Sequence, residues 1–505
     1  MDRRKFLTPA VVSMVGAAAS QLNFAAALET VSSGPEVHVT IDPVQTLAVI
    51  PPDFMGLGYE ISSAARPGLL SAQNAVYVQL IQTLGKNGVI RVGGNTSDYA
   101  TYQATGQPLS SPEGKAGSVV NDAVLRDLGT FLDATGWKLI WGLNLGNSIL
   151  ENAVLEARAV TAATEENLLA FEIGNEPDLF TSHPPRHEGH RPPGYGYDDY
   201  IREYRQYHEA LRKAIPNTPF AGPDAADATD WVVRFAAEEG EDIKLLTHHY
   251  YREGENPTST VEKLLNTDPK LGGILTKLRT ASESSGVPYR ICETNSFSGG
   301  GRPGVSDTFA SALWVLDFMF TLASAGCAGV NMETGVNQRG FISSYSPIGD
   351  DEKCHYCAAP EYYGMLAFAQ SGSGRIIRST IDARERNIRV HATQLGMNPI
   401  VLTIINKEPS FDAVIVIEAA MPFHRGSLIR LSGPSLGSKF GVSLGGARVS
   451  PAGLWKPDRT EEISTSRGRL LVGLPAASAA ISLCILESDL PPFGLVGYCA
   501  TFELV

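Results

Sequence analysis

Residues 168–176 read LLAFEIGNE and carry the pattern that decides the fold. An apolar run that ends abruptly in glycine, asparagine and glutamate is typical of a buried strand whose carboxyl end reaches a polar edge. Similar runs recur along the chain, and between them lie longer segments whose apolar residues recur every three or four positions. Repeated strand and helix units predict parallel strands, and this number of units predicts an α/β fold, a closed (β/α)8 TIM barrel.

The sequence changes character near residue 374. From there to residue 505, short alternating runs separated by Gly, Pro, Ser and Asn predict an antiparallel β-sandwich domain. The catalytic barrel is expected over residues 50–373. The segment 28–49 contains EVHVTIDP, which alternates in the same way and is a candidate strand of the sandwich.

The amino terminus has the pattern of an export signal. Arg3 and Arg4 precede KFL, an apolar run follows, and the small-residue stretch NFAAA comes next. This order predicts a twin-arginine signal peptide over residues 1–27, cut after Ala27; the alternative is an ordinary amphipathic helix. We therefore expect an exported protein, periplasmic or secreted, with no later stretch long enough to span a membrane.

Composition narrows the classes of partner. The chain has 505 residues, 43% of them hydrophobic, and a formal net charge of −13, which disfavours nucleic acid as a partner. Six cysteines are too few for a disulfide scaffold in a chain of this length. Cys354 and Cys357, in CHYC, are interpreted as a local disulfide or two free thiols rather than a zinc site. Cys292 is interpreted as a small buried hydrophobe rather than a nucleophile.

Several apolar runs end in polar residues, where a barrel of this kind builds its active site. These residues are Asn95, Asn144, Glu176, Asp224, His249, Glu293 and Glu333. Glu176 and Glu293 are 117 residues apart, room for about three βα units, so they are expected to face each other across the barrel. Two facing carboxyl groups are what hydrolysis of a glycosidic bond requires.

Four motifs together resemble one family. GNEPD at 174–178, HHYY at 248–251, ETNSFSGGGRP at 293–303 and YSPI at 345–348 are similar to the motifs of glycoside hydrolase family 79, which holds β-glucuronidases and heparanases. The resemblance covers about residues 50 to 370. It implies a barrel with the acid on strand four and the nucleophile on strand seven.

The resemblance also implies roles for single residues. Glu176 matches the general acid/base and Glu293 the nucleophile of a retaining mechanism. Substrate contacts or support are implied for Glu60, Asn95, Asn175, Tyr250, Gly299, Gly300 and Tyr345. Tyr250 matches the tyrosine that hydrogen-bonds the nucleophile, and Gly299, Gly300 and Tyr345 match the cradle of the uronate carboxylate. From the residues alone, the alternative for Glu60 is that it caps a loop.

Three functions remain open from the sequence: an exo-acting β-glucuronidase, an endo-acting enzyme on heparan-type polysaccharide, and a non-catalytic sugar-binding barrel. The acidic composition favours the first, because a sulfated polymer calls for basic clusters along the cleft. No cofactor is expected. The histidines His183, His187 and His190 lie in a proline-rich loop without metal-ligand spacing, so we interpret that loop as a wall of the site. Glu172 and Glu333 are expected to be structural.

Overall fold

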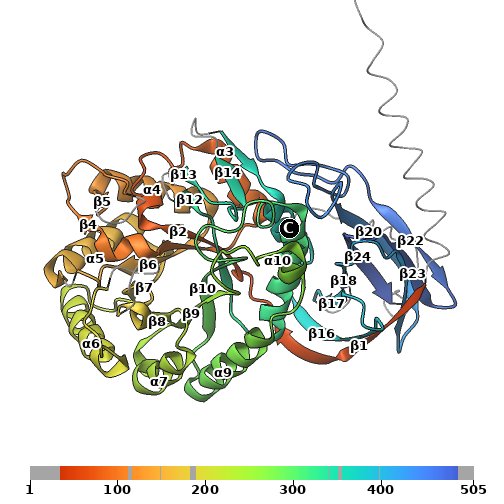
Figure 1. Cartoon of the computed structure of the whole chain (residues 1–505), viewed down its shortest axis with the longest axis horizontal. Coiled ribbons are helices and arrows are strands. Elements are labelled where there is room, and N and C mark those ends of the chain that lie inside the picture. The colour runs from red at the N-terminus through yellow and green to blue at the C-terminus, as the bar shows by residue number, and fades with distance from the viewer. Residues whose placement is uncertain are drawn as a thin grey trace, which may run out of the picture.

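Eight parallel strands form a barrel in the larger part of the molecule (Figure 1). The computed structural model describes residues 35–111, 117–147, 149–181, 189–338, 341–350, 355–396 and 399–486. In chain order the barrel strands are β2 (Met55–Glu60), β3 (Val89–Gly93), β6 (Lys138–Leu143), β7 (Leu168–Ile173), β8 (Ala221–Ala225), β9 (Leu245–Tyr251), β10 (Tyr289–Asn295) and β11 (Val330–Glu333). Seven neighbouring pairs are hydrogen-bonded in parallel, and a bridge between Phe171 and Phe220 joins β7 to β8. The predicted (β/α)8 barrel is confirmed.

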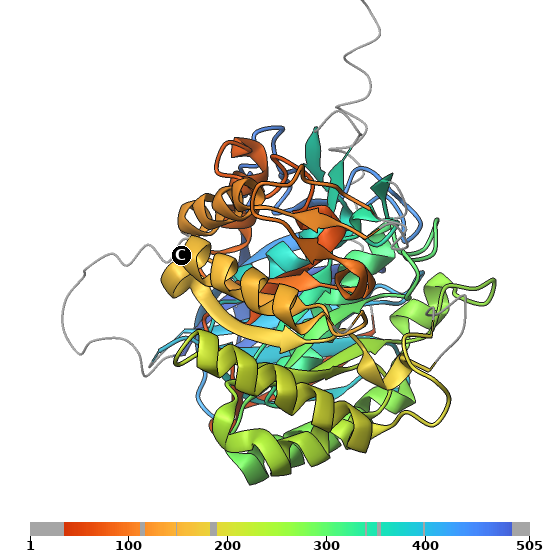
Figure 2. The ribbon, with the colours of Figure 1, turned by 90° about the vertical axis from the view of Figure 1, so that its left-hand side faces the viewer.

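Helices cover the outer surface of the barrel, as the orange to green ribbons of Figure 2 show. The longer ones are α3 (Ala75–Leu84), α4 (Asp122–Thr135), α5 (Leu150–Thr164), α6 (Tyr197–Ala214), α7 (Thr229–Glu239), α9 (Pro269–Ser285), α10 (Phe309–Ser324) and α11 (Pro360–Gln370). Short helices are α2 (Ile61–Ala64) and α8 (Val261–Leu265), with 3-10 turns η1 (Asn95–Tyr99), η2 (Glu165–Asn167), η3 (Pro177–Leu179) and η4 (Gly240–Asp242). Local chemistry sets their ends: Asn121 caps α4 by accepting from the Val124 amide, and Gly136 ends it in the left-handed conformation.

Toward the amino-terminal ends of its strands the barrel holds a buried polar pair, in which Arg290 Nε donates to Asn331 Oδ1 at 2.6 Å. A cluster of small and branched side chains lies beside this pair: Val89, Ile140, Ala170, Ala221, Leu245 and Cys292. Cys292 is fully buried there, and burial raises the pKa of its thiol well above the usual value. Its surroundings therefore agree with the interpretation as a small hydrophobe. Polar side chains gather toward the other, carboxyl end of the strands.

A second sheet stands beside the barrel and packs against it. In chain order its strands are β1 (Glu36–Val49), β16 (Arg375–Asp382), β17 (Ile388–Gln394), β18 (Ile400–Asn406), β19 (Ala413–Ala419), β20 (Phe423–Ser432), β21 (Ser443–Leu444), β22 (Glu461–Ser466), β23 (Arg469–Leu474) and β24 (Ser478–Leu486). Its pairs are antiparallel except β1 with β19, and pairing of β20 with β24 folds the sheet over its own apolar core. The remaining pairs are β4 (Thr101–Tyr102) with β5 (Val119–Val120), β12 (Val336–Gln338) with β13 (Phe341–Ile342), and β14 (Ile348–Asp350) with β15 (Tyr356–Ala358).

A buried ion cluster fastens the barrel to this sheet. Asp317 on α10 accepts from Lys407 Nζ at 2.6 Å and lies 2.8 Å from His391 Nε2, both on the sheet side. Burial opposes ionisation of Asp317, but the contacts with Lys407 and His391 outweigh it and hold the pKa of Asp317 well below its usual value. The barrel and the sheet therefore meet through a specific contact as well as through apolar packing.

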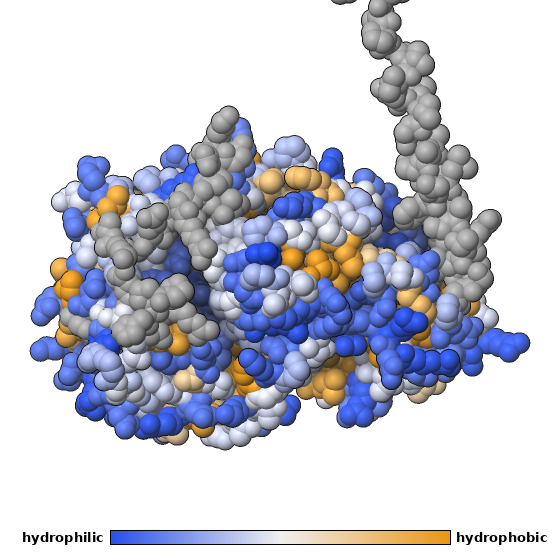
Figure 3. Space-filling view, in the orientation of Figure 1, coloured by the Kyte–Doolittle hydropathy of each residue, from blue (hydrophilic) through white to orange (hydrophobic). Residues whose placement is uncertain are grey.

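Some predictions concern residues outside the described ranges. The signal peptide over residues 1–27 is one, and the pairing of Cys354 with Cys357 and the positions of His183 and His187 are others. Among the described residues, no helix combines the length and the apolar character needed to cross a membrane. The face shown in Figure 3 is mostly hydrophilic, with small hydrophobic patches scattered over it.

Candidate active site

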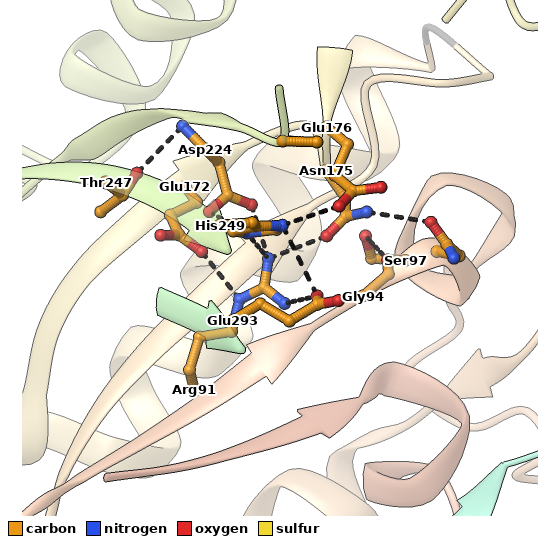
Figure 4. A network of polar contacts seen from close by, with 12 residues as sticks. Arg91, Gly94, Ser97, Glu172, Asn175, Glu176, Asp224, Thr247, His249 and Glu293 are labelled. Atoms are coloured by element: carbon orange, nitrogen blue, oxygen red, sulfur yellow. Dashed lines mark hydrogen bonds and ion pairs between the residues drawn. The ribbon is translucent and has the colours of Figure 1, made fainter. Parts of the chain in front are cut away.

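Glu176 and Glu293 converge at the carboxyl end of the barrel (Figure 4). Glu176 follows β7, the fourth barrel strand, and Glu293 lies in β10, the seventh. One carboxylate oxygen of each, together with a ring nitrogen of His249, all lie within 4.8 Å of one another. Both side chains are only 11% exposed, so the pair sits in a recessed, polar position.

The backbone holds Glu176 in an uncommon conformation. Its φ of 50° and ψ of 49° are left-handed, which for a residue other than glycine costs on the order of 1–3 kcal/mol. The Glu176 amide donates to the Asp224 carbonyl at 3.0 Å, and Pro177 begins the 3-10 turn η3. The turn after β7 is therefore fixed on both sides of Glu176, as expected where a side chain must keep one orientation.

Arg91, in β3, is a buried cation at the centre of the site. Its guanidinium donates to four side chains: to Glu293 Oε2 at 2.8 Å, Glu172 Oε2 at 3.0 Å, Asn175 Oδ1 at 2.9 Å and Asp224 Oδ2 at 2.5 Å. Burial lowers the pKa of Arg91, but the three carboxylates outweigh burial and raise it well above the usual value. Arg91 thus holds the Glu293 carboxylate in a fixed orientation. The sequence signal for it was a single charge inside the apolar run GVIRVGG.

His249 joins the acid/base candidate to Asp224. Its Nδ1 lies 3.0 Å from Glu176 Oε1, and its Nε2 lies 2.7 Å from Asp224 Oδ1. Burial lowers the pKa of His249, but Asp224 and Glu293 outweigh burial and raise it well above the usual value. Each ring nitrogen thus lies within hydrogen-bonding distance of one carboxylate.

The prediction for Tyr250 is wrong by one position. The hydroxyl of Tyr251 donates to Glu293 Oε1 at 3.1 Å, whereas that of Tyr250 donates to Asp268 at 2.8 Å and its ring stacks on Phe318 of α10. Successive side chains of a strand point to opposite faces, so Tyr251 shares the inner face with His249 while Tyr250 faces the helices. The motif HHYY holds two adjacent tyrosines, which is why the sequence match could choose the outer one.

Glu60 and the two asparagines line the same end of the barrel. Glu60 caps η1 by accepting from the Thr96 amide at 2.8 Å and the Asn95 amide at 3.2 Å. Burial, and then the nearby charge of Glu293, raise the pKa of Glu60 to about 7. Asn175 Nδ2 donates to Asn95 Oδ1 at 3.2 Å, so these two predicted contacts lie together.

The glycine run after β10 packs against Tyr345. Gly299, Gly300 and Gly301 have φ values of 82°, 95° and 76°, a backbone that other residues rarely adopt. Gly300 accepts from the Ser344 amide at 2.7 Å, and the ring of Tyr345 stacks on Tyr251 with centroids 6.3 Å apart. The structure thus brings the predicted cradle next to the tyrosine that holds Glu293.

Three further residues lie around the site. Arg302 pairs with Glu255, so its guanidinium is engaged outside the glycine run. His190 packs its ring against Tyr99 and Phe180, with centroids 4.8 and 5.0 Å away. Asn295, which sequence reasoning overlooked, donates from Nδ2 to the Tyr345 carbonyl at 3.2 Å and to Glu361 at 3.0 Å. These bonds fix the backbone at Tyr345.

The two glutamates expected to be structural are both buried near the reacting pair. Glu172 bonds Arg91, and burial followed by the charge of Asp224 raises its pKa to about 7. Burial raises the pKa of Glu333 well above the usual value, and the charges of Glu293 and Glu60 raise it further. Both carboxyls are therefore harder to ionise than a carboxyl in water.

A (β/α)8 barrel with paired glutamates at its fourth and seventh strands defines a glycosidase-type site. β-Glucuronidase of Neurospora crassa is 29% identical to this chain over 359 residues, 62% of each protein. β-Glucuronidase of Aspergillus niger is 27% identical over 364 residues, 65% of this chain and 64% of that protein. Heparanase of Mus musculus is 23% identical over 415 residues, 69% of this chain and 73% of that protein. The predicted resemblance to glycoside hydrolase family 79 is confirmed.

The sequence matches cover only part of each relative. The matched region spans a little under two thirds of the two fungal proteins, and no family model matches the chain. Among solved structures, a 4-O-α-L-rhamnosyl-β-D-glucuronidase from Fusarium oxysporum superposes with a TM-score of 0.73 at 18% identity, over 89% of this chain and all of that one. An α-L-arabinofuranosidase from Thermotoga maritima gives 0.66 at 13% identity, over 89% of this chain and all of that one. These structures support the fold.

Proposed function

We propose that the chain is a retaining, exo-acting β-glucuronidase that releases terminal β-linked glucuronic acid. The observation that carries this proposal is the closeness of Glu176 and Glu293, which have carboxylate oxygens within 4.8 Å of each other. Retaining enzymes hold the two groups about 5–5.5 Å apart, whereas inverting enzymes need roughly 6.5–9.5 Å to admit a water. Relatives named β-glucuronidase support the choice of sugar.

The proposed reaction has two displacements. First, Glu293 attacks the anomeric carbon, a glycosyl ester forms, and the glycosidic C–O bond breaks as Glu176 gives its proton to the leaving oxygen. Then Glu176 takes a proton from water, the water oxygen bonds the anomeric carbon, and the ester bond breaks to regenerate the Glu293 carboxylate. Arg91 and Tyr251 hold Glu293 in its attacking orientation. In this proposal Asn175 hydrogen-bonds the sugar's 2-hydroxyl.

Exo action is favoured by the charge of the chain. An exo-enzyme has to hold one carboxylate, which a few backbone donors and hydroxyls do, whereas an endo-enzyme on a sulfated polymer needs cations along its length. The net charge of −13 provides no general attraction for such a polymer. Endo-β-glucuronidase action is kept as a second candidate because the matched relatives include heparanases.

The test is a hydrolysis panel of aryl β-glucuronide, β-glucoside, β-galactoside and heparan oligosaccharides. We expect cleavage of the glucuronide, and proton NMR of the first-formed sugar should show the β-anomer. Release of monosaccharide without shortening of internal oligosaccharide bonds would support exo action, whereas shortening would favour the endo candidate. An α-anomer formed first would contradict the retaining mechanism, and binding without turnover would favour the sugar-binding barrel.

Export through the twin-arginine route remains part of the proposal. The proposed organisation is a signal peptide, residues 1–27, a barrel, residues 50–373, and a β-rich domain, residues 374–505. A glucuronic-acid-containing carbohydrate is the proposed partner, with neither nucleic acid nor membrane bound by the mature chain.

Tyr251→Phe tests the corrected assignment of the tyrosine. Loss of a hydrogen bond to a charged group costs about 1.5–3 kcal/mol, so kcat/KM for an aryl glucuronide should fall about 10- to 150-fold. Tyr250→Phe is the matched control. It loses only the bond to Asp268, so we expect lower thermal stability with kcat/KM within about threefold of wild type. An equal loss of rate in the two variants would contradict the assignment.

Tyr345→Phe tests the carboxylate cradle. If its hydroxyl meets the uronate carboxylate, the variant should lower kcat/KM for the glucuronide by about tenfold or more. Turnover of the matching glucoside, which is expected to be weak in the wild type, should hardly change because it lacks the carboxylate. Equal slowing of both substrates, or equal cleavage of both by the wild type, would require the cradle to be abandoned.

A further inference from the structure

Asp224 lies in β8, one residue from its carboxyl end, and contacts Glu176, His249 and Arg91. It is fully buried, and its φ of 61° is left-handed, as is that of Glu176. Its amide donates to Thr247 Oγ1 at 2.9 Å, and its carbonyl accepts from the Glu176 amide at 3.0 Å. Two residues other than glycine thus share a strained backbone and one hydrogen bond, a combination typical of functional sites.

The side chain of Asp224 is as fully engaged as its backbone. Oδ1 lies 2.7 Å from His249 Nε2, and Oδ2 accepts from Arg91 at 2.5 Å. On the far side of the imidazole, Nδ1 lies 3.0 Å from Glu176 Oε1 and 3.8 Å from Glu293 Oε2. Each ring nitrogen therefore faces a carboxylate. A neutral imidazole has one donor and one acceptor, so only the imidazolium donates on both sides.

We propose that Asp224 is a positioning residue that keeps both ring nitrogens of His249 protonated, so that Nδ1 donates to Glu176 and never takes its proton. The inference rests on the proposed function, because it concerns the proton that Glu176 passes to the leaving oxygen. A neutral ring with an unprotonated Nδ1 would accept that proton and hold it away from the substrate. A fixed imidazolium instead leaves the proton on the other Glu176 oxygen and stabilises the carboxylate after transfer.

Several other titratable groups surround the imidazole of His249 and its partners. Around the ring lie Arg91 of β3, Glu172 of β7, His248 and Tyr251 of β9 and Glu293 of β10, and beyond Glu293 lie Glu60 of β2 and Glu333 of β11. Burial, and then the charge of His249, lower the pKa of His248 to about 4, so it is neutral. Asp224 is the largest of the influences that raise the pKa of His249.

Asp224→Asn removes this influence and keeps the size of the side chain. The pKa of His249 should fall, so the ring becomes neutral and Glu176 loses the positive charge beside it. The protonated form of Glu176 is then favoured relative to wild type, so the alkaline limb of the kcat/KM profile should move to higher pH by about one unit or more. The maximum of the profile should fall at least tenfold. A purely structural role would lower the rate without moving the limb.

Asp178→Asn is the matched control. Asp178 is a second buried aspartate near Glu176, and it accepts from the amides of Ala226, Asp227 and Ala228 just beyond Asp224. It has no hydrogen bond to His249 among those that the structure describes. We expect Asp178→Asn to lower thermal stability and leave the alkaline limb within a few tenths of a pH unit. An equal shift in the two variants would overturn the proposal.

Nitrogen-15 NMR of labelled histidine rings tests the protonation state of His249 without turnover. In the wild type, His249, assigned by its absence in His249→Gln, should show two protonated ring nitrogens up to at least pH 8. A neutral His249 in the wild type at pH 7 would overturn the proposal. If the wild type cleaves no glucuronide while His249 remains an imidazolium, the proposed function fails separately. If the enzyme is active and folded Asp224→Asn keeps the wild-type profile, the inference alone fails.

Discussion

Glu293→Ala is expected to reduce hydrolysis of an aryl β-glucuronide by about five to six orders of magnitude in kcat, the scale seen when a catalytic nucleophile is removed. Without this carboxylate no glycosyl ester forms, although Arg91 and Tyr251 remain in place around the vacated position. The fall is measured as initial rates of phenol release, with circular dichroism to confirm that the variant is folded.

Added azide allows the role of Glu293 to be tested by the configuration of the product. In Glu293→Ala the removed side chain leaves space beneath the anomeric carbon, so azide should attack there and give an α-glucuronyl azide. Glu293→Gln is the matched control: it is as inactive, but its amide fills the space, so azide should restore little activity. Near-native hydrolysis by either variant, or a β-azide from Glu293→Ala, would show that the nucleophile is a different group.

Much of the fold was predictable because its signals are local. LLAFEIGNE and YRICETN are short apolar runs that end in a carboxylate, and a repeating strand and helix pattern leaves few topologies other than a closed parallel barrel. The convergence of Glu176 and Glu293 follows from their strand positions. A residue's strand and end can therefore be inferred from sequence when the repeat is regular.

The side-chain contacts of Glu176 and Glu293 were harder to predict from the sequence. Tyr251 was missed because adjacent tyrosines differ only in the face they occupy, and a shift of one residue reverses that face. Asp224 and His249 were recognised as polar strand ends, but nothing in the sequence says that they share a hydrogen bond. Arg91 meets Glu293 across 202 positions of sequence, and a charge inside an apolar run does not name its partner.

The resulting site balances charge locally although the whole chain is acidic. Arg91 and His249 are the two cations among the buried carboxyls, and each touches Asp224 as well as one of the reacting glutamates. Because Asp224 contacts both cations, its carboxylate can influence both Glu176 and Glu293. A substitution at Asp224 is thus expected to affect both displacements, whereas substitution of either glutamate alone should affect them unequally.

Glu176→Ala should slow the two displacements unequally. For an alkyl glucuronide, whose leaving oxygen must be protonated, we expect a fall of about 10²- to 10⁴-fold in kcat/KM. For a substrate with an acidic phenol, the first step needs little protonation, so kcat/KM should fall much less while kcat falls because the water is no longer activated. Steady-state kinetics over a series of phenols of graded acidity measure this difference.

Azide and pH then identify Glu176 as the acid/base. Azide needs no deprotonation, so it should accelerate turnover of Glu176→Ala with the good leaving group and give a β-glucuronyl azide, opposite to the product expected from Glu293→Ala. The alkaline limb of the kcat/KM profile should also disappear, because the group whose deprotonation ends activity has been removed. Glu176→Gln, which keeps the shape but cannot carry a proton, should be slow in the same way with less azide rescue. Equal losses for all leaving groups, or an alkaline limb that persists unchanged, would assign the proton to another residue.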